Sequence, residues 1–155
     1  MGELRIRGYQ DGDHDAVWNL HNLALNEVGA HAGNGPWDDD LHAIRRVYLD
    51  SQGEFLVGLA DDEIVAMGAL RRTDTGRAQI TRMRVHPRSQ RRGFGHLILE
   101  RLEDRARELG YDTLHLDTTV EQDAAQAFYR AHGYRETGRT RLGPFRVILF
   151  EKRLG

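Results

Sequence analysis

Hydrophobic residues recur along the chain in two periods, which predict strands and helices. Leu4 and Ile6 alternate with arginine as in a half-buried strand, and later apolar runs lie between turn residues. Elsewhere a spacing of three and four residues is typical of amphipathic helices. The predicted strands are Leu4–Ile6, Phe55–Ala60, Ile64–Leu70, Ala78–Val85, Leu114–Thr118, Tyr134–Thr140 and Phe145–Glu151.

Capping and stop residues mark four predicted helices. Asp11-Gly12-Asp13 supplies turn and N-cap groups before the first helix, and Gly110 is a natural C-terminal stop for the third. A run of aspartates favours the start of the second helix, which Gly53 ends. The predicted helices are Ala16–Leu25, a second from Asp38 through Leu41, Ile44, Val47 and Tyr48, a third with Leu99, Leu102, Ala106 and Leu109 on one face, and Asp123–His132.

The order of these elements predicts an α/β (α+β) fold with one mixed sheet and helices on its faces. The strand, helix and strand between Ala78 and Thr118 require a parallel pair, because the helix carries the chain back to the same end of the sheet. Asp61-Asp62-Glu63 is short enough for an antiparallel hairpin. We expect about seven strands and four helices in a single domain over residues 1–155.

Composition narrows the chemistry that the protein can perform. The 155 residues contain no cysteine, which excludes disulfides, thiolate metal sites and cysteine nucleophiles. The 8 histidines form no His-Glu-x-x-His motif, so no metal site is predicted. The apolar runs are too short to span a bilayer and the N-terminus lacks a signal segment, so we expect a cytoplasmic protein without a membrane partner.

A glycine-containing loop follows the strand that ends at Val85. Residues 90–95 read Gln-Arg-Arg-Gly-Phe-Gly and precede an amphipathic helix. Free amides at a helix N-terminus, with glycines that allow close approach, make such a loop an anion site whose natural guest is phosphate. Taken alone, the pattern fits a plain tight turn with solvated arginines equally well.

Several ligands compete for this loop. A nucleoside triphosphate loop needs Gly-Lys followed by Ser or Thr, and a dinucleotide fingerprint needs a third glycine where Ile98 stands. A nucleic-acid contact would use the arginines, but the net charge of −2 argues against it. The spacing of Gln90, Gly93 and Gly95 instead resembles the coenzyme A pyrophosphate loop of the GNAT acetyltransferase superfamily.

Two neighbouring segments carry the same resemblance. Met83-Arg84-Val85-His86-Pro87 looks like the family's strand and proline connection before the loop. The segment from Ala125 to Tyr134 resembles the family's second motif, an alanine and an aromatic-tyrosine pair on a short helix that glycine ends. The family usually has asparagine where this chain has Gln122, which keeps the amide on a longer stem.

The resemblance implies an acetyl-CoA-dependent N-acetyltransferase in which a primary amine of a small molecule or peptide attacks the thioester directly. It implies that Tyr129 is the general acid for the departing thiolate, although aromatic residues on an alanine-rich helix are more often core residues on physical grounds alone. Coenzyme A contacts are implied for Met83, Arg84, Val85, Gln90, Arg91, Arg92, Gly93, Phe94, Gly95, His96, Gln122, Ala125, Phe128 and Tyr129. Many relatives are dimers, which keeps a homodimer open, and a non-catalytic acyl-CoA-binding module of the same fold is the alternative to an enzyme.

The acceptor side is less defined by the sequence. The family's acceptor specificity usually lies in the segment that matches residues 27–40, so His31 and Trp37 are candidates for substrate binding. Trp37 serves equally well as a hydrophobic staple beside a helix cap at Asp38. An alkylamine is mostly protonated at neutral pH, so a base must remove a proton. The candidates for that base are water beside Gln79, His86, Asp117 and residues of the first helices.

Overall fold

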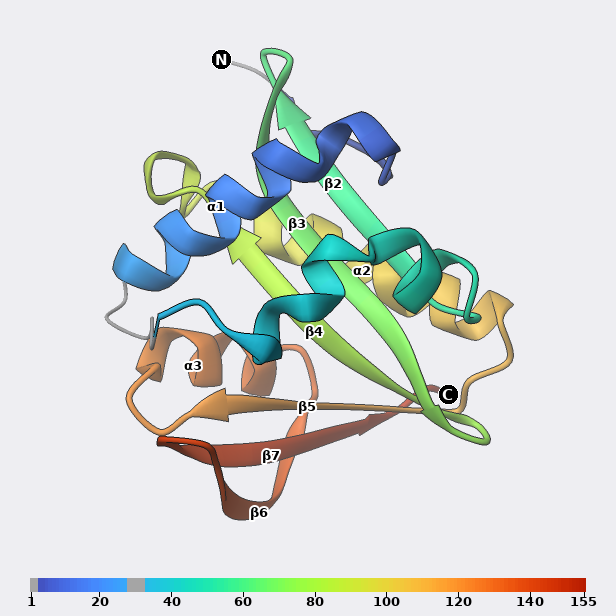
Figure 1. Cartoon of the computed structure of the whole chain (residues 1–155). Coiled ribbons are helices and arrows are strands. Elements are labelled where there is room, and N and C mark those ends of the chain that lie inside the picture. The colour runs from blue at the N-terminus through green and yellow to red at the C-terminus, as the bar shows by residue number, and fades with distance from the viewer. Residues whose placement is uncertain (1–2, 28–32) are drawn as a thin grey trace.

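The computed structural model describes residues 3–27 and 33–155 of the chain. Its centre is a seven-stranded mixed sheet with the strand order β1-β2-β3-β4-β5-β7-β6 (Figure 1). Each predicted strand is confirmed, with small shifts of its ends. The strands are β1 (Arg5–Gly8), β2 (Glu54–Ala60), β3 (Glu63–Asp74), β4 (Arg77–Val85), β5 (Thr113–Thr119), β6 (Arg135–Leu142) and β7 (Phe145–Arg153).

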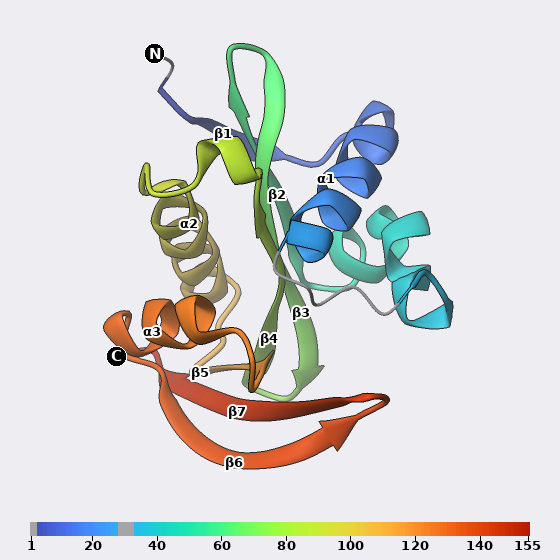
Figure 2. The ribbon, with the colours of Figure 1, turned by 90° about the vertical axis from the view of Figure 1, so that its left-hand side faces the viewer.

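Three of the four predicted helices are confirmed, α1 (His14–Glu27), α2 (Phe94–Glu108) and α3 (Asp123–Ala131). α1 contacts β3 and β4 on one face of the sheet, whereas α2 contacts β2, β3 and β4 on the other. Figure 2 shows β1 to β4 nearly edge-on, with α1 on one side and α2 and α3 on the opposite side. The prediction of a mixed sheet with helices on its faces is therefore confirmed.

The prediction of a second α-helix is wrong, because shorter helices of other types stand in its place. Pro36–His42 forms a 3-10 helix and Arg45–Leu49 a short π-helical turn, and Ala43 between them has a φ of −144° that no helix adopts. Asp38 and Asp40 do not cap a helix here, because their carboxylates bind partners on α1 and β4. Tertiary contacts therefore override the local preference for an α-helix.

Each face of the sheet has its own hydrophobic core. The core under α2 and α3 contains Leu70, Ile98, Leu99, Leu102, Leu114 and Phe150. The core under α1 contains Val17, Leu41, Tyr48, Phe55 and Met67. Within the described residues, no helix combines the length and hydrophobicity needed to cross a bilayer.

β4 and β5 form the one parallel pair among the described strands, as predicted for the unit that contains α2, and they stay paired only at one end. Arg77, Ala78 and Gln79 pair with the first three residues of β5, after which the two strands separate. β7 lies between β5 and β6 and pairs antiparallel with both. The separation leaves main-chain groups of the later part of β4 facing an opening in the sheet.

A β-bulge interrupts β4 opposite Gly68 of β3. The register leaves two residues, Arg82 and Met83, opposite this single glycine, and Arg82 has a φ of +58°. A Cβ on Gly68 would lie 2.5 Å from Sδ of Met83 and 2.6 Å from Cγ2 of Ile98, so packing beneath the bulge requires glycine. The bulge places Arg82 and Arg84 on the α1 face of the sheet and Met83 on the α2 face.

Candidate active site

The loop before α2 presents main-chain groups rather than side chains. Gly93, the N-cap, has a φ of +80°, and Arg91 before it has a φ of +66°. No side chain caps the helix, and its first hydrogen bond joins the Leu97 amide to the Gly93 carbonyl at 3.1 Å. The N–H groups of Phe94 and Gly95 come before Leu97 in the helix and have no carbonyl partner within it, so they remain available to an anion.

A cavity of about 850 Å³, called here the loop cavity, runs from this loop along the end of β4 to α3. It brings together almost all of the residues for which coenzyme A contacts were predicted. Arg92 is not among the residues that line it. The predicted residues that do line it are Met83, Arg84, Val85, Gln90, Arg91, Gly93, Phe94, Gly95, His96, Gln122, Ala125, Phe128 and Tyr129.

Tyr129 projects from α3 into the wall of the loop cavity. Its ring packs edge-on against the rings of Phe128 and Tyr134, with distances between ring centroids of 5.2 and 5.6 Å. Only 7% of the residue is exposed. Burial raises the pKa of the Tyr129 phenol above its ordinary value; Arg84 opposes this shift and Asp117 adds to it. The phenol is thus protonated at neutral pH, and its hydroxyl donates to no group in the described part of the chain.

Gln122 stands just before α3 and borders the loop cavity. Its side-chain amide donates to Oγ1 of Thr119 at 3.0 Å, across the turn that leads from β5 into the helix. Its neighbour Gln126 donates to two main-chain carbonyls of the same turn, each at 3.1 Å. The longer stem of glutamine therefore folds back onto the turn in this structure.

A second cavity, of about 590 Å³ and called here the arginine cavity, lies on the α1 side of β4. Its wall includes polar residues of α1, the 3-10 helix, β4 and β5, together with the turn between β6 and β7. The two cavities share a wall at the end of β4 and the start of α3. The shared residues are Leu25, Met83, Arg84, Gln122, Ala125 and Tyr129.

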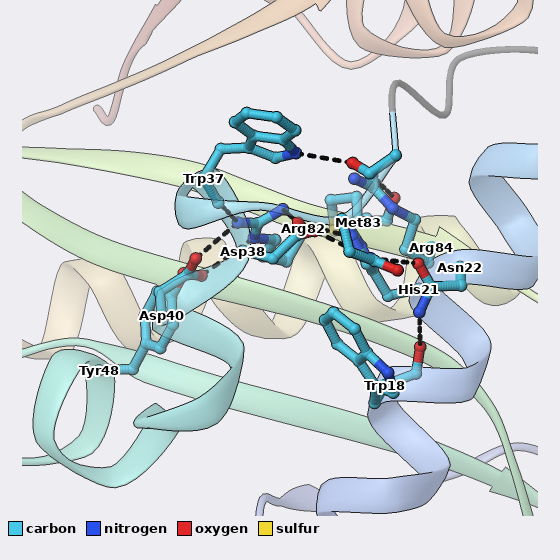
Figure 3. A network of polar contacts seen from close by, with 12 residues as sticks. Trp18, His21, Asn22, Trp37, Asp38, Asp40, Tyr48, Arg82, Met83 and Arg84 are labelled. Atoms are coloured by element: carbon cyan, nitrogen blue, oxygen red, sulfur yellow. Dashed lines mark hydrogen bonds and ion pairs between the residues drawn. The ribbon is translucent and has the colours of Figure 1, made fainter.

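Arg82 is held by a nearly buried ion pair in the arginine cavity (Figure 3). Its Nη2 donates to Oδ1 of Asp40 at 2.6 Å, and its Nε donates to Oδ2 at 3.0 Å. Nη2 also donates to the Trp37 carbonyl at 2.7 Å. The hydroxyl of Tyr48 donates to Oδ2 of Asp40. Burial alone would raise the pKa of Asp40, but the hydrogen bonds and charge of Arg82 hold it below its ordinary value.

His21 and Asp38 form a second buried pair. Nε2 of His21 lies 3.0 Å from Oδ1 of Asp38, and Asn34 donates to the other carboxylate oxygen at 3.0 Å. Burial and the charge of Arg84 lower the pKa of His21 to about 4, so the ring is neutral at pH 7. Because a carboxylate only accepts, Nε2 carries the proton. No sequence motif marks this pair, because its members lie 17 residues apart and meet only in the folded chain.

Arg84 differs from Arg82 in having no carboxylate partner among the described side chains. Its Nη1 donates to the Met83 carbonyl at 2.8 Å, whereas its Nε is buried and has no partner among residues 3–27 and 33–155. Burial and the nearby charge of Arg82 lower the pKa of Arg84 to about 10, which leaves it a cation at neutral pH. Arg84 lies on the wall that the two cavities share.

Of the candidate bases, Asp117 lines the arginine cavity where β4 and β5 separate, and so does Gln79, beside which a water was the other candidate. Nε2 of Gln79 lies 3.5 Å from Oδ2 of Asp117, and burial raises the pKa of the Asp117 carboxyl. His86 lies elsewhere: its Nδ1 accepts from the Arg88 amide, and it lines a separate cavity with Arg7. The geometry therefore favours Asp117 over His86.

The two predicted substrate-binding residues have different outcomes. Trp37 lines the arginine cavity with 58% of its surface exposed, and its indole N–H donates to the Gly33 carbonyl at 3.1 Å (Figure 3). His31 lies outside the described residues. In the described ranges, no three His, Asp or Glu side chains gather in a way that could hold a metal ion.

Comparison with known proteins places this chain in a family. The sequence model of the acetyltransferase (GNAT) family matches residues 15–134. The chain is 32% identical over 127 residues to a [ribosomal protein bS18]-alanine N-acetyltransferase from Salmonella typhimurium, covering 80% of this chain and 76% of that protein. It is 36% identical over 85 residues to an IAA acetyltransferase from Azospirillum brasilense, covering 54% of this chain and 56% of that protein, little more than half its length. The chain therefore belongs to the acetyltransferase (GNAT) family.

Solved structures show the same fold. An acetyltransferase of the GNAT family from Staphylococcus aureus Mu50 superposes with a TM-score of 0.91 at 20% identity, covering 99% of this chain and 100% of that chain. The PaiA N-acetyltransferase from Thermoplasma acidophilum, solved in complex with coenzyme A, superposes with a TM-score of 0.81 at 15% identity, covering 98% and 99%. At these identities the likeness establishes the fold alone.

Proposed function

We propose that the protein transfers the acetyl group of acetyl-CoA to a primary amine of a small molecule or peptide, by direct attack in a ternary complex. The observation that carries the proposal is the wall shared by the loop cavity and the arginine cavity, which contains Tyr129. Two reactants that enter from opposite sides of β4 would meet at this wall. When bound, acetyl-CoA supplies an activated acetyl carbonyl, and the chain supplies position and proton transfer.

The loop cavity is the proposed donor site. The amides of Phe94 and Gly95, at the uncapped N-terminus of α2, suit the pyrophosphate of acetyl-CoA. Past Gln79, β4 no longer pairs with β5, so the edge of β4 at Met83 and Val85 is open to pantetheine, whose amides would share the Met83 and Val85 carbonyls with Arg84 and Gln90. The predicted contacts of Arg92 and Gln122 have less support, since one lies off the cavity and the other is turned toward Thr119.

Tyr129 is the proposed hydrogen-bond donor to the departing thiolate. Full proton transfer from a phenol with an ordinary pKa of about 10 to a thiolate whose thiol has a pKa of about 8.5 is unfavourable in free energy. Burial raises the pKa of the Tyr129 phenol and makes this transfer less favourable still. Stabilising the thiolate through a hydrogen bond demands no complete transfer. The same raised pKa keeps the phenol protonated over the whole neutral range.

Asp117 is the proposed acceptor of the amine proton, directly or through water beside Gln79. It lies in the arginine cavity, and burial raises its pKa, which makes it a stronger base than an exposed carboxylate. The amine nitrogen forms the new bond to the acetyl carbon while the carbon–sulfur bond breaks. Trp37, on the rim of the cavity, is the proposed contact for the body of the acceptor.

Two measurements test the proposal. Calorimetry with acetyl-CoA measures donor binding, and release of the coenzyme A thiol over a panel of primary amines measures transfer. We expect binding and turnover of at least one amine class, with the acetylated amine confirmed by mass spectrometry. Acetyl-CoA binding without turnover across the whole panel would instead establish the non-catalytic acyl-CoA-binding module.

A further inference from the structure

The two arginines of the arginine cavity differ in how their charge is balanced. Arg82 forms a two-point ion pair with Asp40 at 2.6 and 3.0 Å. No Asp or Glu oxygen lies within 4.0 Å of the Arg84 guanidinium among the described side chains. Arg84 therefore feels the charges of Asp38 and Asp40 only from a distance and forms no ion pair with a described side chain.

The other acidic groups of the cavity are already engaged. Asp38 accepts from His21 and Asn34 and lies 3.7 Å from Arg82, and Asp117 is contacted by Gln79. His21 is neutral at pH 7 and adds no charge. A buried charge without a partner is costly, and arginine does not escape the cost by losing its proton at neutral pH. The imbalance at Arg84 therefore favours an anion brought in by a ligand.

The free edge of Arg84 has the geometry of a carboxylate receptor. Nη1 is committed to the Met83 carbonyl, whereas neither Nε nor Nη2 donates to a residue of the described chain. Nε–H and Nη2–H point from the same edge of a guanidinium, and together they match the two oxygens of a carboxylate. Arg84 lines the shared wall together with Tyr129, where the acceptor nitrogen has to arrive in the proposed reaction.

We propose that Arg84 binds the carboxylate of the acceptor, so that the substrates are free amino acids rather than simple alkylamines or the amino ends of proteins. The inference rests on the proposed acetyl transfer and names its acceptor class. A short ammonium carboxylate places its nitrogen near the thioester when its carboxylate is held at Arg84. A peptide lacks this carboxylate beside its terminal amine and leaves the guanidinium unpaired.

Matched acceptors test the inference in the whole protein. Thiol release is measured for several amino acids, their carboxamides and their decarboxylated amines, with kcat/KM expressed per neutral amine because the three forms differ in amine pKa. For the wild type we expect the amino acid to exceed its carboxamide by at least about 30-fold, as for a lost charge-assisted pair. Equal values for acid and amide, with transfer intact, overturn the inference and leave the proposed function standing.

Substitutions then assign the preference to one side chain. We expect Arg84→Gln to reduce the ratio of acid to amide to near one and Arg84→Lys to keep part of it, because lysine retains the charge without the fork. Arg135→Gln, which removes an exposed cation on β6, leaves the ratio unchanged. A preference that survives Arg84→Gln overturns the assignment to Arg84.

An equilibrium measurement separates this inference from the proposed reaction. Calorimetry compares N-acetyl amino acids with N-acetyl amino acid amides in the presence of coenzyme A. Tighter binding of the acid that Arg84→Gln abolishes supports the anion site even if no amine is acetylated, in which case the proposed function alone falls. Equal binding of acid and amide, together with a lack of turnover, overturns both. Amino acids should also raise the melting temperature of the wild type but not of Arg84→Gln.

Discussion

The loop cavity and the arginine cavity meet at one wall but are built in opposite ways. The loop cavity takes its key groups from consecutive main-chain amides at the start of α2, where Gly93 leaves the helix without a side-chain cap. The arginine cavity is lined by side chains from α1, the 3-10 helix, β4 and β5. Among these, His21 pairs with Asp38, and Arg82 pairs with Asp40, which is not itself part of the lining. The amides of the loop cavity are neighbours in sequence, whereas the side-chain pairs of the arginine cavity form only when the chain folds.

This difference bears on how each side can vary. Main-chain amides are common to every residue, so the loop depends on backbone geometry and tolerates exchange of most side chains. Buried ion pairs depend on each partner, because removing one leaves the other charged and unpaired. We therefore expect the donor side to be sensitive at glycine and the acceptor side to be sensitive at charged side chains.

The largest effect is expected for Arg82→Met, which leaves Asp40 in the arginine cavity without its ion pair. We expect the free energy of unfolding to fall by about 3–5 kcal/mol, measured by urea denaturation at pH 7. Arg139→Met, which breaks an exposed pair of similar length with Glu136, should change it little. Equal losses for both variants would contradict the view that the acceptor side is held by buried charge.

The same variant carries a pH dependence with a defined sign. Arg82 holds the folded pKa of Asp40 below its ordinary value, so the stabilisation from this pair is present above the ordinary pKa and is lost as the pH falls through the folded one. In Arg82→Met only burial acts strongly on Asp40 and raises its folded pKa, so the difference in stability between wild type and variant should begin to shrink above about pH 4 and continue to shrink as the pH falls through the lowered pKa of the wild type. A difference that stays constant down to pH 2 would assign the loss to packing instead.

Gly93→Asp should break the donor side. The substitution places a side chain at a φ of +80° and a negative charge beside the proposed pyrophosphate, so we expect the Kd for acetyl-CoA to rise at least about 100-fold by calorimetry. Gly110→Asp is the matched control, since Gly110 has a φ of +89° at the other end of α2 with open space around it. If both variants bind acetyl-CoA alike, the loop is not the donor site.

Asp117→Asn should remove the proposed base while leaving donor binding intact. We expect kcat to fall about 30- to 100-fold, with the Kd for acetyl-CoA unchanged. Burial raises the pKa of Asp117, and the base works in its charged form, so wild-type activity should rise as the pH rises through that pKa. The variant should lack this rise in its pH–activity profile. Asp104→Asn, on the exposed face of α2, serves as control. An unaltered pH profile would return the role to another group.

Tyr129→Phe should give the smallest of these effects, because only a hydroxyl at the shared wall is removed. We expect kcat to fall about 10-fold with acetyl-CoA affinity nearly intact, measured by thiol release and calorimetry. Tyr111→Phe removes a phenol that bonds the Gln52 carbonyl outside both cavities and should leave kcat unchanged. Unchanged turnover in Tyr129→Phe would refute the role of this hydroxyl.

Most of the fold, and the grouping of residues around the loop cavity, could be predicted from the sequence because both depend on local patterns. Strands and long helices follow from hydrophobic period, and the loop at Gly93 and the helix at Tyr129 are contiguous motifs. The acceptor side could not be predicted in the same way. Asp40 and Arg82 are 42 residues apart, and the second predicted helix was wrong because its aspartates bind tertiary partners instead of capping.

The β-bulge at Arg82 allows the arginine cavity, the proposed acceptor side, to change without disturbing the loop cavity, the proposed donor side. It adds one residue to β4 opposite Gly68, and the alternation of faces resumes at Met83, so the extra side chain is gained by the α1 face alone. A different residue at position 82 would alter the chemistry offered to an acceptor while the main chain of Val85 kept its direction. In evolutionary terms, the bulge separates two parts of β4. Residue 82 is free to change with the acceptor amine, whereas the part near Val85 would bind acetyl-CoA whichever amine is acetylated.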